Sequence, residues 1–215
     1  MPQLFKFLSL LSVNNNREWF NCHKEEFNYL RNLWLADLKL LIGRMAEYDN
    51  SLRGVDVKDC VYRIYRDIRF SPNKLPYKTY LGAVIARGGR KTPKSCYYIH
   101  FEPGHCGLFG GIWCPEQSIL NALRHEIDNN IEEFLDIIDE PSFKSRYTLS
   151  GDSLKTMPKG FPKELPHAKY IKMKEYIFSM PVADDYFLRN DWIERAASDF
   201  KPSKPLHDFL NYVFD

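Results

Sequence analysis

The sequence predicts an α+β fold, with a mainly antiparallel sheet flanked by helices and a long helix near the N-terminus. Three observations lead to this prediction. Apolar residues recur at intervals of three and four over residues 17–46, which is the period of an amphipathic helix. Beyond residue 60 the period changes to two, as in strands with one buried face. The loops between these strand-like runs are short, which favours antiparallel pairing because parallel neighbours need a long crossover.

Two further helices are predicted besides the long one. Residues 4–13 are mostly apolar and predict a short buried helix; Lys6 interrupts the run and no small-residue cleavage site follows, so it is not interpreted as a signal peptide. The asparagines at positions 14–16 predict N-caps for the long helix, since their side chains accept hydrogen bonds from free N–H groups. An amphipathic helix is predicted to begin at Pro115 and to extend to Ile138.

Short runs of β-branched and aromatic residues, bounded by glycine and proline, predict the strands. In the first of them the even positions are apolar and the odd positions mostly polar, and a proline-containing loop follows at residues 71–78. Gly110 and Gly111 indicate a bulge or a close backbone approach within a later strand. The predicted strands cover residues 60–70, 80–87, 96–101, 107–113 and 175–180.

No internal repeat and no long linker divides the chain, so residues 1–215 are predicted to form one domain. Residues 141–215 are a Pro- and Lys-rich subregion of it, with one or two helices predicted between residues 184 and 214. A composition of 44% hydrophobic and 27% charged residues excludes disordered and collagen-like chains. No uncharged run reaches the roughly 18 apolar residues of a membrane span, so no membrane partner is predicted.

The five cysteines indicate a reducing environment. Their number is odd and none lies in a C-x-x-C pair, so a disulfide framework is not expected. The cysteine pattern therefore favours the cytoplasm.

The formal net charge of +2 conceals charge that is sorted along the chain. Residues 53–94 hold eleven basic residues against three acids, a net of +8, and residues 155–174 hold six lysines against one glutamate, a net of +5. Residues 126–140 hold seven acids and neither lysine nor arginine. This sorting predicts a basic face that concentrates anionic partners. The alternative is that the acidic and basic sets neutralise each other across the fold.

Several standard catalytic motifs are absent. The chain has no G-x-x-x-x-G-K-[ST], no G-x-S-x-G, no H-E-x-x-H and no G-x-G-x-x-G after a strand. P-loop ATPases, α/β-hydrolases and Rossmann dehydrogenases are therefore disfavoured, and no cofactor is indicated.

The basic residues between positions 63 and 78 form the strongest candidate site. Arginine forks beside lysines suit phosphate or carboxylate, because a guanidinium donates two parallel hydrogen bonds and lysine adds a mobile charge. Alternation directs Arg66 toward the apolar side, where its charge needs an acid or a ligand. The alternative is a surface ladder in which Arg63 and Arg69 pair with Asp67 or with acids on neighbouring strands. The predicted ligand-binding residues are Arg63, Arg66, Arg69, Lys74, Tyr77, Lys78 and Lys159, with Lys155 as an alternative to Lys159.

The predicted ligand is an anionic small molecule or nucleotide that carries phosphate. Nucleic acid is a further candidate partner, because aromatic residues beside basic grooves stack on bases. The aromatic residues considered for that role are Tyr77, Tyr97, Tyr98 and Trp113, each of which is equally suited to a core.

Five long motifs occur in a fixed order: NNNREWF (14–20), RIYRDIRFSPNKLPYKT (63–79), YYIHFEPG (97–104), GGIWCPE (110–116) and LKTMPKGF (154–161). Together they resemble the bacterial and fungal proteins grouped as domain of unknown function 2461. The resemblance runs over nearly the whole chain and implies that residues 1–215 are one unit. It implies no activity, cofactor or catalytic residue.

Two alternative functions follow from other residues. A hydrolase or transferase would use His100 and Glu102, which share one face of a predicted strand with Cys96. Thiolate and imidazole are zinc ligands, and His105, Cys106 and Cys114 follow nearby, but the spacings match no standard zinc pattern, so no metal site is assigned. A protein-interaction module would instead use the acidic helix and the basic strand as complementary surfaces. The sequence does not predict an oligomeric state.

Overall fold

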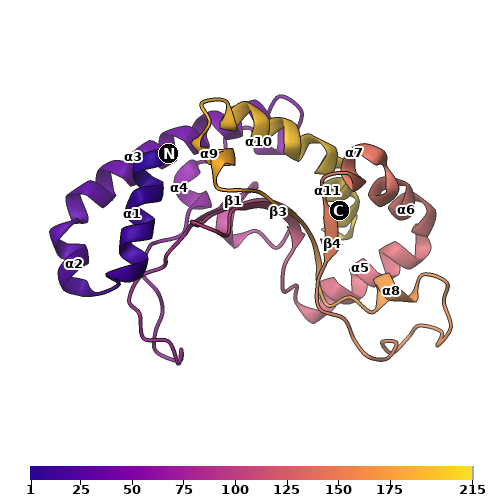
Figure 1. Cartoon of the computed structure of the whole chain (residues 1–215). Helices are drawn as coiled ribbons and strands as arrows, with labels where there is room; N and C mark the ends of the chain where they lie inside the picture. The colour runs from indigo at the N-terminus through magenta and orange to yellow at the C-terminus, as the bar shows by residue number, and fades with distance from the viewer. Residues whose placement is uncertain (215) are drawn as a thin grey trace.

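The computed structural model describes residues 1–214 and shows an arched sheet with helices gathered on its convex side (Figure 1). The strands are β1 (Leu81–Ile85), β2 (Cys96–Phe101), β3 (Gly107–Ile112), β4 (Thr148–Ser150) and β5 (Tyr176–Pro181). They form a five-stranded sheet in the order β1-β2-β3-β5-β4, and all neighbours are antiparallel. The predicted α+β class is therefore confirmed.

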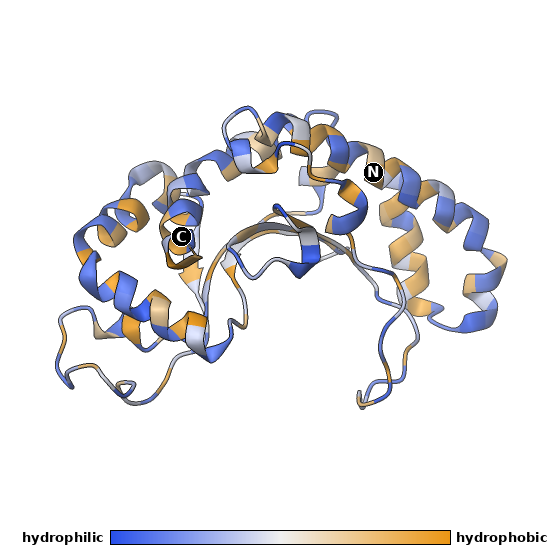
Figure 2. Ribbon diagram, turned by 180° about the vertical axis from the view of Figure 1, so that it is seen from behind, coloured by the Kyte–Doolittle hydropathy of each residue, from blue (hydrophilic) through white to orange (hydrophobic). Residues whose placement is uncertain are grey.

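The helices cover the two ends and the top of the arch. Two long loops, residues 61–80 and 151–167, extend from its opposite ends on the concave side (Figures 1 and 2). The helices are α1 (Pro2–Val13), α2 (Arg17–Cys22), α3 (Lys24–Met45), α4 (Val57–Cys60), α5 (Gln117–Asn129), α6 (Ile131–Asp139), α7 (Pro141–Lys144), α8 (Ala168–Ile171), α9 (Asp185–Leu188), α10 (Trp192–Phe200) and α11 (Lys204–Asn211). Short 3₁₀ turns are η1 (Asn50–Leu52), η2 (Gly89–Lys91), η3 (Lys201–Ser203) and η4 (Tyr212–Phe214).

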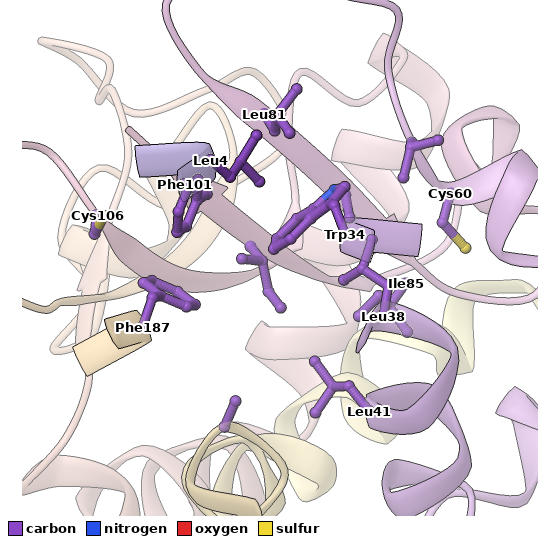
Figure 3. Close-up of a cluster of buried hydrophobic side chains, with 14 of the residues drawn as sticks. Leu4, Trp34, Leu38, Leu41, Cys60, Leu81, Ile85, Phe101, Cys106 and Phe187 are labelled. Carbon is purple, nitrogen blue, oxygen red and sulfur yellow. The ribbon is translucent and has the colours of Figure 1, made fainter. Parts of the chain in front are cut away.

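Alternation along the strands divides the sheet into a core face and a second face, which we call the open face. On the core face Ala83, Ile99 and Leu108 lie in one cross-strand row and are fully buried. Figure 3 shows the cluster around them, in which the ring of Trp34 from α3 lies 5.5 Å from that of Phe101. Burial alternates along β2, whereas every residue of β1 is buried, including Val84 on the open face.

The buried hydrophobic residues form two clusters, one among α1, α3 and α10 and the other among α5, α6 and α11. Met180 of β5 packs against both clusters. The continuous sheet and this shared side chain are compatible with one domain over residues 1–215, which stays a prediction.

Two of the predicted helices are interrupted. The helix expected over residues 17–46 is split at His23, because the His23 ring hydrogen-bonds the Trp19 carbonyl at 2.8 Å and stacks on the Trp19 ring. The helix expected from Pro115 begins at Gln117 and breaks at Asn130, whose side chain turns back to the Glu126 carboxylate at 2.7 Å.

Residues 141–214 contain more regular structure than the sequence predicts. Strand β4 and helices α7 and α8 were not expected, and three helices rather than one or two follow β5. β4 has only three residues and α7 and α8 only four each, so none is long enough to show a period in the sequence.

Buried polar contacts fasten β2 and the residue before it to two distant segments. Ser95 Oγ lies 2.7 Å from His207 Nδ1, and the Ser95 N–H donates to Asn211 Oδ1 at 2.8 Å, which fixes α11 to the sheet. Tyr97 Oη donates to the buried carboxylate of Asp49 at 2.9 Å, which fixes the segment after α3. Buried polar groups with partners are tolerated in a core, whereas unpaired ones, such as Nε2 of the same His207 ring, are costly.

All five cysteines are free thiols. Within residues 1–214, no helix has both the length and the apolar character needed to cross a membrane.

Candidate functional site

Residues 61–80 form a two-limbed arm that leaves the sheet and returns to it. Tyr65 and Tyr77 form an isolated bridge, and the Lys78 N–H donates to the Ile64 carbonyl at 2.8 Å. The prediction of a regular strand over residues 60–70 is therefore wrong. Its first residue instead ends α4, which Asp56 caps by accepting from the Lys58 N–H. The returning limb contains prolines, which lack the N–H that a longer ladder requires.

Asn15 and Tyr77 hold the base of the arm. The Asn15 side chain donates to the Tyr77 carbonyl at 3.0 Å and accepts from the Tyr77 N–H at 3.1 Å. The Tyr77 ring stacks on Phe20 with centroids 4.0 Å apart and is only 4% exposed. Tyr77, predicted to bind ligand, thus has its ring in the core, where its contacts anchor the arm.

Basic residues at the tip of the arm are engaged within the tip itself. The Arg69 guanidinium lies 2.6 Å from the Asp67 carboxylate and lowers the pKa of Asp67 to about 2 through the hydrogen bonds it donates. Lys74 Nζ donates to the Ile68 carbonyl at 2.9 Å, and Arg66 Nη2 reaches Ser71 Oγ at 3.5 Å. Arg69 therefore pairs with Asp67, as in the surface ladder that was the alternative to an anion site.

A second group of cations lies at the base of the arm, and we call Arg63, Lys78 and Arg90 the arm-base cluster. Lys78 Nζ lies 4.8 Å from the Tyr62 ring centroid and 5.5 Å from that of Tyr80, and the Arg90 guanidinium lies 5.8 Å from the Tyr62 centroid. These contacts place cationic groups over aromatic rings.

The charges of the arm-base cluster repel one another. Burial lowers the pKa of Lys78, and the positive charges of Arg63 and Arg90 lower it further. Arg90 Nε donates to the Asp59 carbonyl at 2.9 Å. Throughout residues 1–214, no carboxylate forms an ion pair with any of these three cations. The cluster is therefore a concentration of positive charge that no ion pair within residues 1–214 neutralises, although the charge of Arg63 contributes to lowering the pKa of Asp67.

The open face of the sheet begins beside this cluster. No helix covers its centre in Figure 1, and the side chains there are half-buried. One cross-strand row runs from β1 to β4 through Val84, Tyr98, Phe109, Ser179 and Thr148. Aromatic rings thus occupy the centre of the row and small side chains its far end.

A chain of hydrogen bonds crosses the open face next to that row. Tyr98 Oη lies 3.1 Å from His100 Nδ1, His100 Nε2 lies 3.0 Å from Glu102 Oε2, and Thr79 Oγ1 donates to Glu102 Oε1 at 2.5 Å. Burial acts to raise the pKa of Glu102, but the hydrogen bonds from Thr79 and His100 outweigh it, so the pKa is lowered and the group is ionised. The Tyr80 ring lies 4.6 Å from the His100 ring and links this chain to the arm-base cluster.

These contacts select one tautomer of the neutral His100 ring. The ionised Glu102 requires a proton on His100 Nε2, which leaves Nδ1 to accept from Tyr98 when the ring is neutral. Burial raises the pKa of Tyr98, so its phenol stays protonated near neutral pH. A hollow of about 440 Å³ borders these residues and is lined also by Gly104, His105, Cys106, Phe109, Pro181 and Val182.

Lys159 lies at the other end of the open face from the arm. Its loop, residues 151–167, is fastened to α5 by His167 Nε2, 2.7 Å from Asp128 Oδ1, and by the Phe161 ring, stacked 4.6 Å from that of His125. Lys155 and Lys159 are exposed. The arm and the loop of residues 151–167 leave opposite ends of the arch (Figure 1), so the loop that carries Lys159 lies away from the arm-base cluster.

The structure adds residues to the candidate site that the sequence did not single out. Arg90 belongs to the basic segment of residues 53–94, but the sequence does not show that it lies beside Lys78. The two residues come together because β1 carries the chain back past the base of the arm. Tyr62 is at an even position, which the alternation predicts to face the core, and is nevertheless 36% exposed. Thr79 carries no signal in the sequence. Of the four aromatic residues considered for stacking, Tyr77 and Tyr97 are buried in the core, Tyr98 is half-buried and Trp113 is 73% exposed.

The candidate metal ligands do not gather. In the part of the chain that the structure describes, no three His, Cys, Asp or Glu side chains are grouped so that they could hold a metal ion. Cys96 Sγ and Cys106 Sγ contact the backbone carbonyls of Gly111 and Glu102.

Comparison with protein families identifies a match over nearly the whole chain. A family model described as "Conserved hypothetical protein (DUF2461)" matches residues 3–209. No curated protein and no solved structure matches the chain.

Proposed function

From the premise that the chain belongs to the DUF2461 family, whose description states no activity, we propose from the geometry that the protein binds a phosphate-bearing anion at the arm-base cluster. The observation that carries the proposal is the crowding of Arg63, Lys78 and Arg90 without a carboxylate partner within residues 1–214. A bound anion would supply the missing counter-charge.

Phosphate fits the chemistry of this cluster. Guanidinium groups donate paired hydrogen bonds to two phosphate oxygens, and the ammonium group of Lys78 adds a point charge. The half-buried position of Lys78 makes its attraction to an anion stronger than that of a fully solvated lysine, because the effective dielectric constant is lower there.

We expect Lys78→Met and Arg63→Gln each to weaken the binding of pyrophosphate about tenfold or more, since a hydrogen bond to a charged group contributes about 1.5–3 kcal/mol. Isothermal titration calorimetry of the full chain measures the affinity. Lys39→Met is the matched control, because Lys39 is exposed on α3. Lys74→Met tests whether the tip of the arm contributes to binding, because Lys74 lies at the tip and Lys78 at the base. The proposal would be contradicted if Lys74→Met lost pyrophosphate binding while Lys78→Met bound pyrophosphate as tightly as the unmodified protein.

A hydrolase or transferase that uses His100 and Glu102 is the second candidate. The chain from Thr79 through Glu102 and His100 to Tyr98, beside a hollow of about 440 Å³, favours it. Both imidazole nitrogens are occupied in this geometry, so a reaction would require Tyr98 to give way before His100 could act as a base.

We expect phosphoester hydrolysis by such an enzyme to fall at least about a hundredfold in His100→Gln, since general acid–base catalysis contributes about 10²–10⁴ in rate. Release of p-nitrophenol from p-nitrophenyl phosphate and its diester is the measurement. Absence of turnover by the unmodified protein, or an unchanged rate in His100→Gln, would contradict this candidate.

A cytoplasmic location is part of the proposal. The five free thiols support it, because disulfides are rare there. Cell fractionation with an antibody to the chain would test it.

A further inference from the structure

We propose that the open face binds single-stranded nucleic acid, with bases stacked on Tyr98 and Phe109 and the backbone running from the arm-base cluster toward the loop of Lys155 and Lys159. The inference rests on the proposed function, because the arm-base cluster supplies the first phosphate site. It goes further by naming the ligand class and a second binding region.

The aromatic rings lie against the sheet rather than standing away from it. A Cβ atom added to Gly82 would be 2.5 Å from Tyr98 Oη and 3.0 Å from two of its ring carbons. A Cβ added to Gly107 would be 2.5 and 2.8 Å from ring carbons of Phe109. The two glycines therefore leave the space that the rings occupy. A ring that lies over a glycine and is half-buried offers an exposed face or edge to a base that stacks beside it.

The two rings are neighbours across β2 and β3. Tyr98 and Phe109 are directly paired in the register, and their centroids are 6.0 Å apart with the ring planes inclined at 52°. The hydrogen bond between Tyr98 and His100 fixes one ring, and packing on Gly107 fixes the other. Because every base has an aromatic face, such a platform accepts different sequences.

Basic segments lie at both ends of this platform. The arm-base cluster adjoins β1 and β2 through Tyr80 and His100, whereas Lys155 and Lys159 lie in the loop that extends from the other end of the arch (Figures 1 and 2). Four strand spacings separate β1 from β4, about 19 Å at 4.8 Å each. A compact phosphate ligand cannot span this distance, whereas a chain of nucleotides can.

Single strands fit the platform better than a duplex. The bases of a duplex are stacked on each other, so their faces are not offered to protein side chains. The hollow lined by Tyr98, His105 and Phe109 has a volume of about 440 Å³, which leaves room beside the rings for an unpaired base. Ser179 and Thr148, farther along the same row, are small and do not obstruct the backbone.

Fluorescence anisotropy of end-labelled oligothymidylate and oligouridylate of eight nucleotides tests the inference. We expect Tyr98→Leu and Phe109→Leu each to weaken binding about tenfold, since stacking contributes about 1–3 kcal/mol per base. Tyr29→Leu is the matched control, because Tyr29 is an exposed tyrosine on α3. Circular dichroism confirms that each variant is folded, and Phe109→Leu serves alone if Tyr98→Leu does not fold.

Salt dependence tests the second binding region. For single strands the slope of log K against log [salt] is about −0.7 per neutralised phosphate. We expect Lys159→Met to reduce the slope by about 0.7 for the eight-nucleotide strand, and Lys39→Met to leave it unchanged. An unchanged slope in Lys159→Met would overturn the extended path.

Two competitors separate this inference from the proposed function. An eight-base-pair duplex and a ring-free inorganic polyphosphate of matched charge should both bind less tightly than the single strand. If polyphosphate binds equally well, depends on Lys78 and is unaffected by Tyr98→Leu, the inference is overturned while the anion site stands. If Lys78→Met and Arg63→Gln leave the binding of pyrophosphate and of the strand unchanged, the proposed function itself fails.

Discussion

Replacing Gly111 with alanine is expected to destabilise the fold by at least about 4 kcal/mol, a loss reached only by severe packing or backbone conflicts. Gly111 has φ +108°, which side chains rarely adopt, and an added Cβ would overlap the backbone carbonyl oxygen of Tyr176 on β5. Because the obstacle is backbone, no rotamer change relieves it. β3 and β5 would have to separate at the centre of the sheet.

Urea unfolding followed by circular dichroism measures this effect, and Gly54→Ala is the matched control. Gly54 also has positive φ, +77°, but an added Cβ would have no atom within 4 Å. The free energy of unfolding of Gly54→Ala should fall by only about 1–2 kcal/mol, the cost of positive φ in a residue with a side chain. Equal midpoints for the two variants would contradict the expected clash. An insoluble Gly111→Ala beside a folded Gly54→Ala would agree with it.

Acidification is expected to destabilise the protein through His207, by up to about 1.4 kcal/mol per pH unit below the ordinary histidine pKa. His207 is 3% exposed, and its Nε2 has no hydrogen-bond partner among the described residues. Burial lowers the pKa of His207 to about 3; Asp49 acts to raise it and Lys204 to lower it. The folded state therefore excludes a proton that the unfolded chain binds between about pH 6.5 and pH 3.

The contribution of His207 is fully present above pH 6.5 and falls as the pH decreases toward 3. Urea midpoints at pH 7.0 and 4.5 measure it, and the difference between the unmodified protein and His207→Gln removes the contribution of carboxyl groups. We expect the unmodified protein to lose about 2 kcal/mol more than His207→Gln over this interval. His125→Gln, which removes an exposed imidazole, should behave like the unmodified protein. Equal losses in all three would contradict the assignment.

Much of the fold could be predicted because most elements bury one face. The strands β1, β2 and β3 lie within segments predicted from their β-branched and aromatic residues, and β5 extends one residue beyond its segment. The long helix α3 lies within the segment predicted from its apolar period. The break at His23 could not be predicted, since it depends on one ring bonding one carbonyl. The alternation in residues 60–70 predicted a strand wrongly, because most of the arm does not pack against the core. Phe70 has core parity in the sequence and is 94% exposed.

The candidate site could be predicted only in part, for a related reason. The density of basic residues in the sequence singles out Arg63 and Lys78, but not which cations share a surface. Arg69 and Lys74 turn inward to their own loop, whereas Arg90 joins from beyond β1. The positions of the Tyr98 and Phe109 rings depend on Gly82 and Gly107, and a glycine in a strand does not reveal which side chain will lie across it.

The strand order β1-β2-β3-β5-β4 also determines when the sheet can be completed as the chain leaves the ribosome. The first three strands are joined by short connections and can close early, because short loops lose little entropy. β4 emerges before β5, yet β5 is its one strand neighbour in the sheet. Until residue 181 is available, β3 remains an unpaired edge open to other chains. Synthesis of residues 113–181 is therefore the interval in which we expect aggregation to compete with folding.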